Sequence, residues 1–302
     1  MSRPHVVTSS ELQSLRDLEL VTKTTVEGLR QGLHRSPFHG YSAEFSQYRH
    51  YRPGDDLKYV DWKVFARTDR IYTRQFRETT NLSALFVLDV SRSMDFPTGN
   101  REPGIGNHKT KFDLARSVAA VLGALVLDQG DAAGVLAVDS RAHYVPPRSG
   151  HHHLRVFLSE LAGLQPGGAV TIGDALLRAA AIVKRRGLVI VISDLYDDEG
   201  AIGQLRRLSR MGHDVIVVHT LAREEMTLDV GGAAEFVDLE SGRKLMVQPS
   251  SVRDAYVATF RQWLSTVERE LRKEGIDYVR LSTDMPIEPA LRRFLVGRGG
   301  TS

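Results

Sequence analysis

An aspartate and two serines alternate along the chain where a predicted strand ends. Asp89 is the penultimate residue of the apolar run ALFVLDV, and Ser91 and Ser93 follow it. Asp194 directly follows a second apolar run, LVIVIS. If these runs are neighbouring parallel strands, both carboxylates and both hydroxyls meet at the carboxyl edge of one sheet. Carboxylates a few ångströms apart repel each other unless a proton or a cation lies between them.

The residue types at this edge predict a site for a hard divalent cation. The chain contains no cysteine, so a metal must be held by oxygen or imidazole ligands. Carboxylates and hydroxyls suit Mg²⁺ or Mn²⁺ that keep several waters. Thr171, in the glycine-rich stretch GGAVTIGDAL, could approach the ion from the start of a predicted helix. The predicted metal ligands are Asp89, Ser91, Ser93, Thr171 and Asp194.

The elements that must position these residues predict an α/β fold with a doubly wound, mostly parallel sheet. From about residue 83, short β-branched runs alternate with longer amphipathic stretches, as in βαβ units. The predicted strands are Ala84–Val90, Ala132–Val138, a short edge strand Ala142–Val145, Leu188–Ser193, Val215–His219 and Tyr278–Leu281. Helices are predicted over Phe112–Gln129 and from Ser251 to Gly275, and residues 233–247 read as a hairpin turning at Glu240–Gly242.

The first 80 residues differ from the rest of the chain in composition and in the pattern of their apolar residues. They begin with a polar helix near residues 10–32, followed by a loop rich in Tyr, His and Arg. Alternating apolar residues predict two strands, near 58–66 and 71–77, joined by a turn at Thr68–Arg70. We therefore expect two regions, residues 1–80 with a helix and a small β-rich part, and residues 81–302 with the main sheet.

Composition and charge exclude several classes of protein. Of the 302 residues 42% are hydrophobic and 25% are charged, which excludes a disordered chain or a coiled-coil rod. The net charge of only +3 gives no reason to expect nucleic acid as a partner. No apolar run is long enough for a membrane span and no signal peptide is recognisable, so we expect no membrane insertion and a cytoplasmic protein. A phosphate-binding GxxxxGK[ST] loop is also missing.

These residues resemble known families. The Asp89-x-Ser91-x-Ser93 pattern, a threonine after two glycines and Asp194 resemble the metal-ion-dependent adhesion site of von Willebrand factor A domains, whose fold is Rossmann-like. The stretch from PFHGYSAEF at residue 37 to DVSRSM at residue 94 strongly resembles the bacterial domain of unknown function 58, which carries a von Willebrand A-like fold. This chain departs from the usual Gly-Gly-Thr pattern, because Ala169 follows the glycines and Thr171 comes two positions later.

The resemblance implies a binding function, because no enzymatic activity is established for this family, and we expect this chain not to be an enzyme. Members of this family are often encoded beside MoxR-type AAA+ ATPases and are thought to act as adaptors or co-chaperones. The leading hypothesis is therefore a Mg²⁺-dependent module that binds a MoxR-type AAA+ ATPase and its client. Many members carry membrane helices, and this chain departs from them in having none. Its metal ion would keep an open coordination position that a carboxylate of the partner fills.

The alternative is a haloacid-dehalogenase-like phosphatase. In that case Asp89 is the nucleophile, and Asp194 with Asp198 holds Mg²⁺. That family places an aspartate two residues after the nucleophile as general acid, and here Ser91 stands at this position. Lys184 is the candidate for the lysine that neutralises the phosphate.

Overall fold

A computed structural model describes most of the chain. The described residues are 9–30, 38, 43–52, 55–56, 59–78, 82–97, 110–167, 170–196, 198–229, 232, 234–239 and 242–299. Contacts between Cα atoms divide the chain into two compact units. The larger unit comprises Met1–Pro37 and Ser83–Ser302, and the smaller unit comprises Phe38–Leu82.

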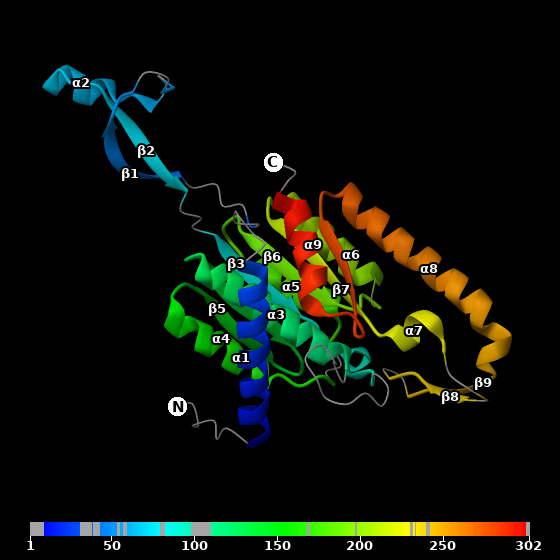
Figure 1. Ribbon diagram of the computed structural model, residues 1–302. Helices are drawn as coiled ribbons and strands as arrows, with labels where there is room; N and C mark the ends of the chain where they lie inside the picture. Colours follow the sequence, from blue (N-terminus) through cyan, green and yellow to red (C-terminus); the bar gives the residue numbers. More distant parts are fainter. Residues whose placement is uncertain are drawn as a thin grey trace. The chain divides into compact units, whose positions relative to one another are not determined.

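The larger unit is built on a six-stranded sheet with the strand order β10-β7-β6-β3-β4-β5 (Figure 1). Five strands are parallel, and the edge strand β5 runs antiparallel to β4. The strands are β3 (Ser83–Leu88), β4 (Ala132–Val138), β5 (Ala142–Arg148), β6 (Leu188–Ser193), β7 (Asp214–Leu221) and β10 (Asp277–Ser282). The predicted mostly parallel sheet is confirmed, and β5 lies at its edge as expected.

Helices cover both faces of this sheet. On one face α5 (Ile172–Ile182), α6 (Asp198–Arg210) and α8 (Pro249–Lys273) share a buried apolar core with β3, β4, β6 and β7. On the other face lie α3 (Lys111–Asp128) and α4 (His151–Gly163), where the rings of Phe86 and Phe157 meet edge to face at 5.3 Å. Most strand residues are fully buried because the sheet is covered on both sides.

The N-terminal helix α1 (Ser9–Arg30) groups with the larger unit. It packs against α3, α4 and the C-terminal helix α9 (Ile287–Gly299) (Figure 1). One guanidinium nitrogen of Arg292 in α9 donates a 2.6 Å hydrogen bond to the carbonyl of Gly28. The helix expected near residues 10–32 is therefore present, but it does not form a domain with the segment that follows it.

Helix ends in the larger unit follow the expected residue chemistry. α3 spans Lys111–Asp128, close to the prediction, and Gly130 just beyond it has a φ of 85°, which side chains other than glycine rarely adopt. Gly275, with a φ of 70°, follows the end of α8 in the same way. α8 starts at Pro249, two residues before the predicted Ser251, because proline is well suited to the first turn of a helix.

The predicted hairpin over residues 233–247 is present. Strands β8 (Ala234–Val237) and β9 (Lys244–Val247) pair antiparallel. Gly242 lies in the turn with a φ of 70°, whereas Glu240 lies outside the described residues. A short helix, α7 (Arg223–Thr227), precedes the hairpin.

The smaller unit corrects one prediction. Its antiparallel strands are β1 (Ala43–His50) and β2 (Tyr72–Glu78), and β2 matches the strand predicted near 71–77. The strand predicted near 58–66 is wrong, because α2 (Trp62–Thr68) occupies most of it. Asp61 caps this helix by accepting hydrogen bonds from the backbone N–H groups of Lys63 and Val64, at 3.0 and 3.1 Å. Apolar residues three apart in a two-turn helix are easily mistaken for alternation.

Two glycines of the larger unit predict opposite stability changes. Gly203 lies in the interior of α6 and is exposed, and no atom of the described residues lies within 4 Å of a Cβ added to it. Gly203→Ala should raise the free energy of unfolding by up to about 1 kcal/mol, because alanine favours the helix.

At Gly134, where the register of β4 and β5 shifts, a Cβ would lie 2.5 Å from the Val145 carbonyl oxygen. Gly134→Ala should be destabilising. Urea denaturation checks both signs, and a loss of stability in Gly203→Ala would contradict this account.

No described helix is long and apolar enough to cross a membrane.

Candidate functional site

Two aspartates meet at the carboxyl edge of the sheet, where strand order reverses. β3 lies between β4 and β6, and Leu88 of β3 is level with Ile192 of β6. Asp89 and Ser193 are the next residues of the two strands, and Asp194 follows. The backbone N–H of Asp89 continues the pairing by donating to the carbonyl of Ile192 at 3.0 Å. The crevice at such a reversal is the usual binding position in open α/β sheets.

Asp89 is buried and held by two hydrogen bonds. Its side chain accepts from the backbone N–H of Ser91 at 2.9 Å and from the hydroxyl of Ser193 at 2.6 Å. Burial, followed by the negative charge of Asp194, raises the pKa of Asp89 to about 6, although the hydrogen bonds act in the opposite direction. The two carboxylates therefore feel each other's charge, as the sequence predicts. Near neutral pH Asp89 is ionised, but at a cost in free energy.

A lysine neutralises Asp194. Lys111, the first residue of α3, is fully buried, and its Nζ lies 2.7 Å from Asp194 Oδ2 and 2.7 Å from Glu225 Oε1. The same Nζ lies 4.5 Å from the centroid of the Tyr196 ring, a cation–π distance. Burial raises the pKa of Glu225, against the opposing effect of the Lys111 charge. Lys111 thus connects the end of β6 to the short helix α7.

A buried histidine supports the loop that carries Asp194. His219 Nε2 lies 2.8 Å from the Asp194 carbonyl oxygen, and Nδ1 lies 2.8 Å from the Tyr278 hydroxyl. Since a carbonyl can only accept, Nε2 carries the proton, and Nδ1 accepts from the tyrosine. Burial lowers the pKa of His219 to about 4, so the ring is neutral at physiological pH. Trp263 of α8 packs on both His219 and Tyr196, at ring-centroid distances of 5.4 and 5.6 Å.

The two serines lie beside Asp89. The Oγ atoms of Ser91 and Ser93 are 3.0 Å apart, and both residues are half-buried at the start of the short 3₁₀ turn Arg92–Asp95. Hydroxyl oxygens this close can both face a single cation. Asp89, Ser91, Ser93 and Asp194 are therefore brought together at one edge of the sheet.

Thr171 has a different role in this structure. Its hydroxyl caps α5 by accepting from the backbone N–H of Asp174 at 3.3 Å, and the residue is exposed. The segment before it does approach β3, because the N–H of Gly167 donates to the carbonyl of Val90 at 2.9 Å. Among the described residues no hydrogen bond joins Thr171 to the other four predicted ligands. Its role as a ligand stays a prediction, and Ala169 lies outside the described residues.

Comparison with known proteins identifies the family. The family described as "Protein of unknown function DUF58" matches residues 47–264. The chain belongs to the DUF58 family. It is 30% identical over 293 residues to the "Uncharacterized protein Rv1480" of Mycobacterium tuberculosis (strain ATCC 25618 / H37Rv), covering 94% of this chain and 89% of that protein. It is 29% identical over 128 residues to the "Uncharacterized protein YeaD" of Bacillus subtilis (strain 168), covering 42% of this chain and 28% of that protein.

Two solved structures are similar to this DUF58 chain at low TM-scores. The "conserved hypothetical protein BatB" from Bacteroides thetaiotaomicron is 18% identical, with a TM-score of 0.43, and the match covers 73% of this chain and 100% of that one. The "PilB minor pilin" from Streptococcus sanguinis is 13% identical, with a TM-score of 0.38, over 76% of this chain and 63% of that one.

The charges at the site of the DUF58 chain do not balance. Among the described residues the cluster contains three carboxyl groups, of Asp89, Asp194 and Glu225, and one ammonium group, of Lys111, which pairs with Asp194 and Glu225 only. With all four ionised, the cluster carries two more negative than positive charges in a region of low dielectric constant. A divalent cation would neutralise this excess, and Asp89 with the two serine hydroxyls is the hard oxygen set that Mg²⁺ and Mn²⁺ prefer.

The same site could hold a cation only with few protein ligands. Among the described residues no three His, Asp or Glu side chains are grouped to hold a metal ion. One oxygen of Asp194 is taken by Lys111, and the other accepts from the backbone N–H of Tyr196 at 3.3 Å. The residues fit a cation that is bound through Asp89, the serines and water. Direct contact of the cation with Asp194 Oδ2 requires Lys111 to move away from this oxygen.

Sequence reasoning missed Lys111 and Glu225. A signal for Lys111 exists, because it precedes Leu114 and Val118 at three and seven positions, on the buried stripe of α3. A lysine on an apolar stripe indicates a buried partner of opposite charge. Glu225 offers no comparable signal, since α7 is only five residues long and none of them is fully buried.

The geometry is unfavourable to the phosphatase alternative. Lys184 lies four residues before β6 begins, at the opposite end of the strand from Asp194. A six-residue strand spans roughly 20 Å, so Lys184 cannot neutralise a phosphate at the carboxyl edge. The side chain of Asp198 lies outside the described residues. The ammonium group that does reach the site, that of Lys111, binds Asp194 and not Asp89.

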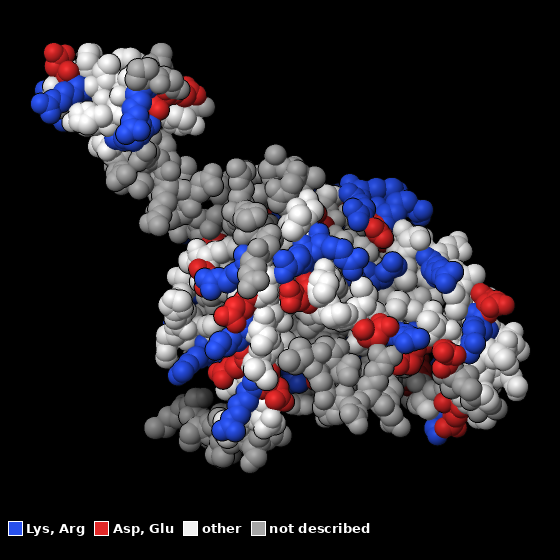
Figure 2. Space-filling model, viewed as in Figure 1, with Lys and Arg blue, Asp and Glu red and all other residues white. Residues whose placement is uncertain are grey.

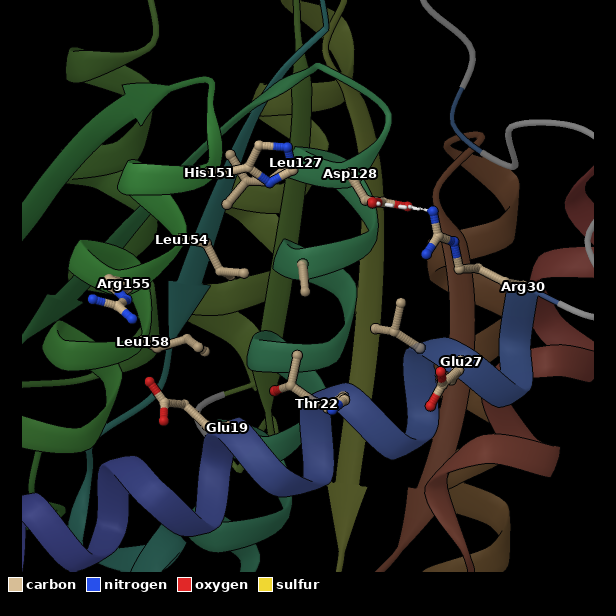
Figure 3. A pocket seen from close by; sticks show the side chains of 13 residues that line it. Glu19, Thr22, Glu27, Arg30, Leu127, Asp128, His151, Leu154, Arg155 and Leu158 are labelled. Atoms are coloured by element: carbon tan, nitrogen blue, oxygen red, sulfur yellow. Dashed lines mark hydrogen bonds and ion pairs between the residues drawn. The ribbon is translucent and has the colours of Figure 1, made fainter.

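A separate cleft lies between α1 and the pair α3 and α4 (Figure 3). Its volume is about 440 Å³, and Leu127, Leu154 and Leu158 form part of its wall. An ion pair between Arg30 and Asp128, at 3.0 Å, closes one end. None of the predicted metal ligands lines this cleft.

Replacement of Thr22, which lines this cleft, is expected to stabilise the protein. Thr22 is 5% exposed, and its Oγ1 has no hydrogen-bond partner in the part of the chain that the structure describes, whereas the exposed Thr24 donates to the Leu20 carbonyl at 2.9 Å. Thr22→Val keeps the side-chain shape and removes the unsatisfied hydroxyl, so thermal and urea denaturation should show a gain of about 1 kcal/mol. The control Thr24→Val should give no gain. Equal effects of the two substitutions would contradict the assignment of Thr22 as unsatisfied.

Charged side chains elsewhere on the larger unit are mixed in sign. On the face shown in Figure 2, acidic and basic groups are interspersed over most of the described surface. Several are paired, such as Arg206 with Glu274 at 2.8 Å and Arg253 with Asp229 at 3.0 Å.

Proposed function

We propose that this DUF58 chain is a divalent-metal-dependent protein-binding module with a site of the von Willebrand factor A type. The ligands would be Asp89, Ser91 and Ser93, with Asp194 reached directly or through water, and Thr171 as a further candidate. The observation that carries the proposal is the convergence of Asp89 and Asp194 from neighbouring strands, with an excess of negative charge that Lys111 alone does not balance.

Such a site binds and does not catalyse. Serine hydroxyls are neutral, so an ion held by Asp89 and two serines keeps positive charge and open positions. An Asp or Glu side chain from another protein could fill one of these positions. The position two residues after Asp89, where the phosphatase family places its general acid, is occupied by Ser91, whose hydroxyl is a poor acid. We propose that the chain is not an enzyme.

We further propose that the partner is a MoxR-type AAA+ ATPase, acting with a client protein in the cytoplasm. This step rests on the family resemblance of residues 37–94. The mixed signs of charge on the visible face support a protein partner better than nucleic acid (Figure 2). The proposal requires no membrane insertion.

Metal binding provides the first test. Mn²⁺ or Mg²⁺ should raise the melting temperature of the wild type, and at ten times the dissociation constant the gain is about 1.4 kcal/mol. Asp89→Ala should abolish this gain. Asp139→Ala is the matched control, because Asp139 also follows a strand and accepts from the backbone N–H two residues later, of Arg141, at 2.8 Å. Differential scanning fluorimetry with and without EDTA measures the effect.

Partner binding provides the second test. The ATPase should be retained by the wild type in Mg²⁺ and lost with EDTA or with Asp89→Ala. Retention that is unaffected by both changes would exclude the metal-dependent mechanism. A phosphatase screen with Mg²⁺ tests the alternative, and turnover that requires Asp89 would replace the adaptor proposal with an enzyme.

A further inference from the structure

Lys111 occupies the position beside Asp194 Oδ2 that a cation bound to this oxygen would take. Its Nζ lies 2.7 Å from Asp194 Oδ2 and is fully buried. The second partner of this ammonium group, Glu225 Oε1, is at the same distance, on α7. Among the described groups, those that face Nζ are these two carboxylates and the rings of Tyr196 and Phe96, at 4.5 and 5.6 Å.

This arrangement lets the ammonium group give up one partner without becoming unpaired. Lysine has a flexible four-carbon stem and presents its charge at a single point, so a small pivot can break one contact and keep the other. Loss of the Asp194 contact alone leaves Lys111 paired with Glu225 and in contact with Tyr196. A divalent cation and the Lys111 ammonium group cannot both occupy the position beside Asp194 Oδ2, because their charges repel.

We propose that Lys111 is an internal competitor of the divalent cation for Asp194, and that Glu225 holds the ammonium group when the cation is bound. The inference rests on the proposed metal-dependent function and deepens it. Lys111 keeps Asp194 neutralised in the metal-free protein and thereby sets the metal affinity of the site. Since Glu225 belongs to α7, cation occupancy is coupled to the position of that helix.

Competition predicts that removal of Lys111 strengthens metal binding. Lys111→Met should bind Mn²⁺ at least about 10-fold more tightly than the wild type, a difference of about 1.4 kcal/mol. Free Mn²⁺ can be measured by electron paramagnetic resonance during a titration. The matched control is Lys273→Met, because Lys273 forms an exposed ion pair with Glu270 at 3.3 Å on α8 and should leave the affinity unchanged.

A double-mutant cycle separates competition at Asp194 from a general effect of charge. In an Asp194→Asn background there is no carboxylate at position 194 for which Lys111 and the cation compete. Lys111→Met should therefore change the Mn²⁺ affinity by less than about 2-fold. An equal gain in both backgrounds would show that Lys111 acts only through its charge, and would overturn the inference.

The fluorescence of Trp263 provides a test that does not depend on measuring the metal affinity. It contacts Tyr196, which carries the Lys111 ammonium group on its ring. In a Trp62→Phe background Trp263 is the only tryptophan of the chain. Mn²⁺ is paramagnetic and quenches, so Mg²⁺ is the probe: it should change the Trp263 emission in the presence of Lys111 and have a clearly smaller effect in Lys111→Met.

The outcomes distinguish failure of the proposed metal-dependent function from failure of the proposed competition by Lys111. If neither wild type nor Lys111→Met binds Mn²⁺ more than Asp89→Ala does, the proposed function fails, and this inference fails with it. If the wild type binds Mn²⁺ through Asp89 and Lys111→Met binds it equally or more weakly, only the competition fails. Lys111→Met that does not fold in EDTA can be refolded in Mn²⁺, and tighter binding predicts that the metal restores the fold.

Discussion

Lys111→Met should lower the free energy of unfolding by about 3–5 kcal/mol in the presence of EDTA. The ammonium group is the only positive charge in contact with Asp194 and Glu225 among the described residues, and all three side chains are buried or nearly so. Methionine fills a similar volume, so the loss comes from two carboxylates left without a counter-charge. Chemical denaturation measures the change.

The control for this prediction is Lys273→Met on α8. Lys273 is 62% exposed, and an exposed pair of this kind contributes less than about 0.5 kcal/mol. If Lys111→Met cost no more than Lys273→Met, the buried carboxylates would have to be protonated in the folded protein, and the charge excess that supports metal binding would not exist.

In contrast to Lys111→Met, Asp89→Asn should raise the free energy of unfolding. In metal-free protein the folded-state pKa of Asp89 is about 6, against 3.8 for an unperturbed aspartate, and each unit corresponds to about 1.4 kcal/mol. Keeping this carboxylate ionised at about pH 8 therefore costs up to about 3 kcal/mol. Asparagine preserves the acceptor for the Ser91 N–H and removes the charge, so the variant should be more stable than the wild type in EDTA.

The pH dependence of this gain follows from the raised pKa. Between about pH 4 and 6 the unfolded chain releases the Asp89 proton while the folded protein keeps it, so wild-type stability falls as the pH rises through this range. The advantage of Asp89→Asn should accordingly be small near pH 4, grow up to about pH 6, and remain constant above it. Asp139→Asn is the control, because the N–H of Arg141 lowers the pKa of Asp139 and its replacement should bring no gain. A gain for Asp89→Asn that does not vary with pH would contradict the assigned cause.

The convergence of Asp89 and Asp194 could be predicted from the sequence because it depends only on strand ends. Two apolar runs that each end in an aspartate, on neighbouring parallel strands, must bring these residues to the same edge. The von Willebrand A-type assignment and the metal remain proposals, since they depend on donor atoms that could serve other roles. Thr171 illustrates this point, because the same hydroxyl that could bind an ion caps α5.

The parts that could not be predicted depend on contacts between distant segments. Glu225 lies 114 positions from Lys111, in a helix of five residues, so no local pattern connects them. The error near residues 58–66 has a local cause. Asp61 satisfies two N–H groups at the start of α2, and the Tyr48 hydroxyl donates to its other carboxylate oxygen at 2.9 Å. This tertiary contact helps to fix a helix where alternation of apolar residues indicated a strand.

The antiparallel strand β5 at one end of the sheet limits how another protein can attach there. Two of its seven residues, Pro146 and Pro147, have no backbone N–H. Because successive N–H groups of a strand point to opposite edges, one of these two prolines removes a donor from the free edge, and an incoming chain that tried to extend the sheet would find a gap there. Edge-to-edge association, the first step of many aggregates, is disfavoured along this border.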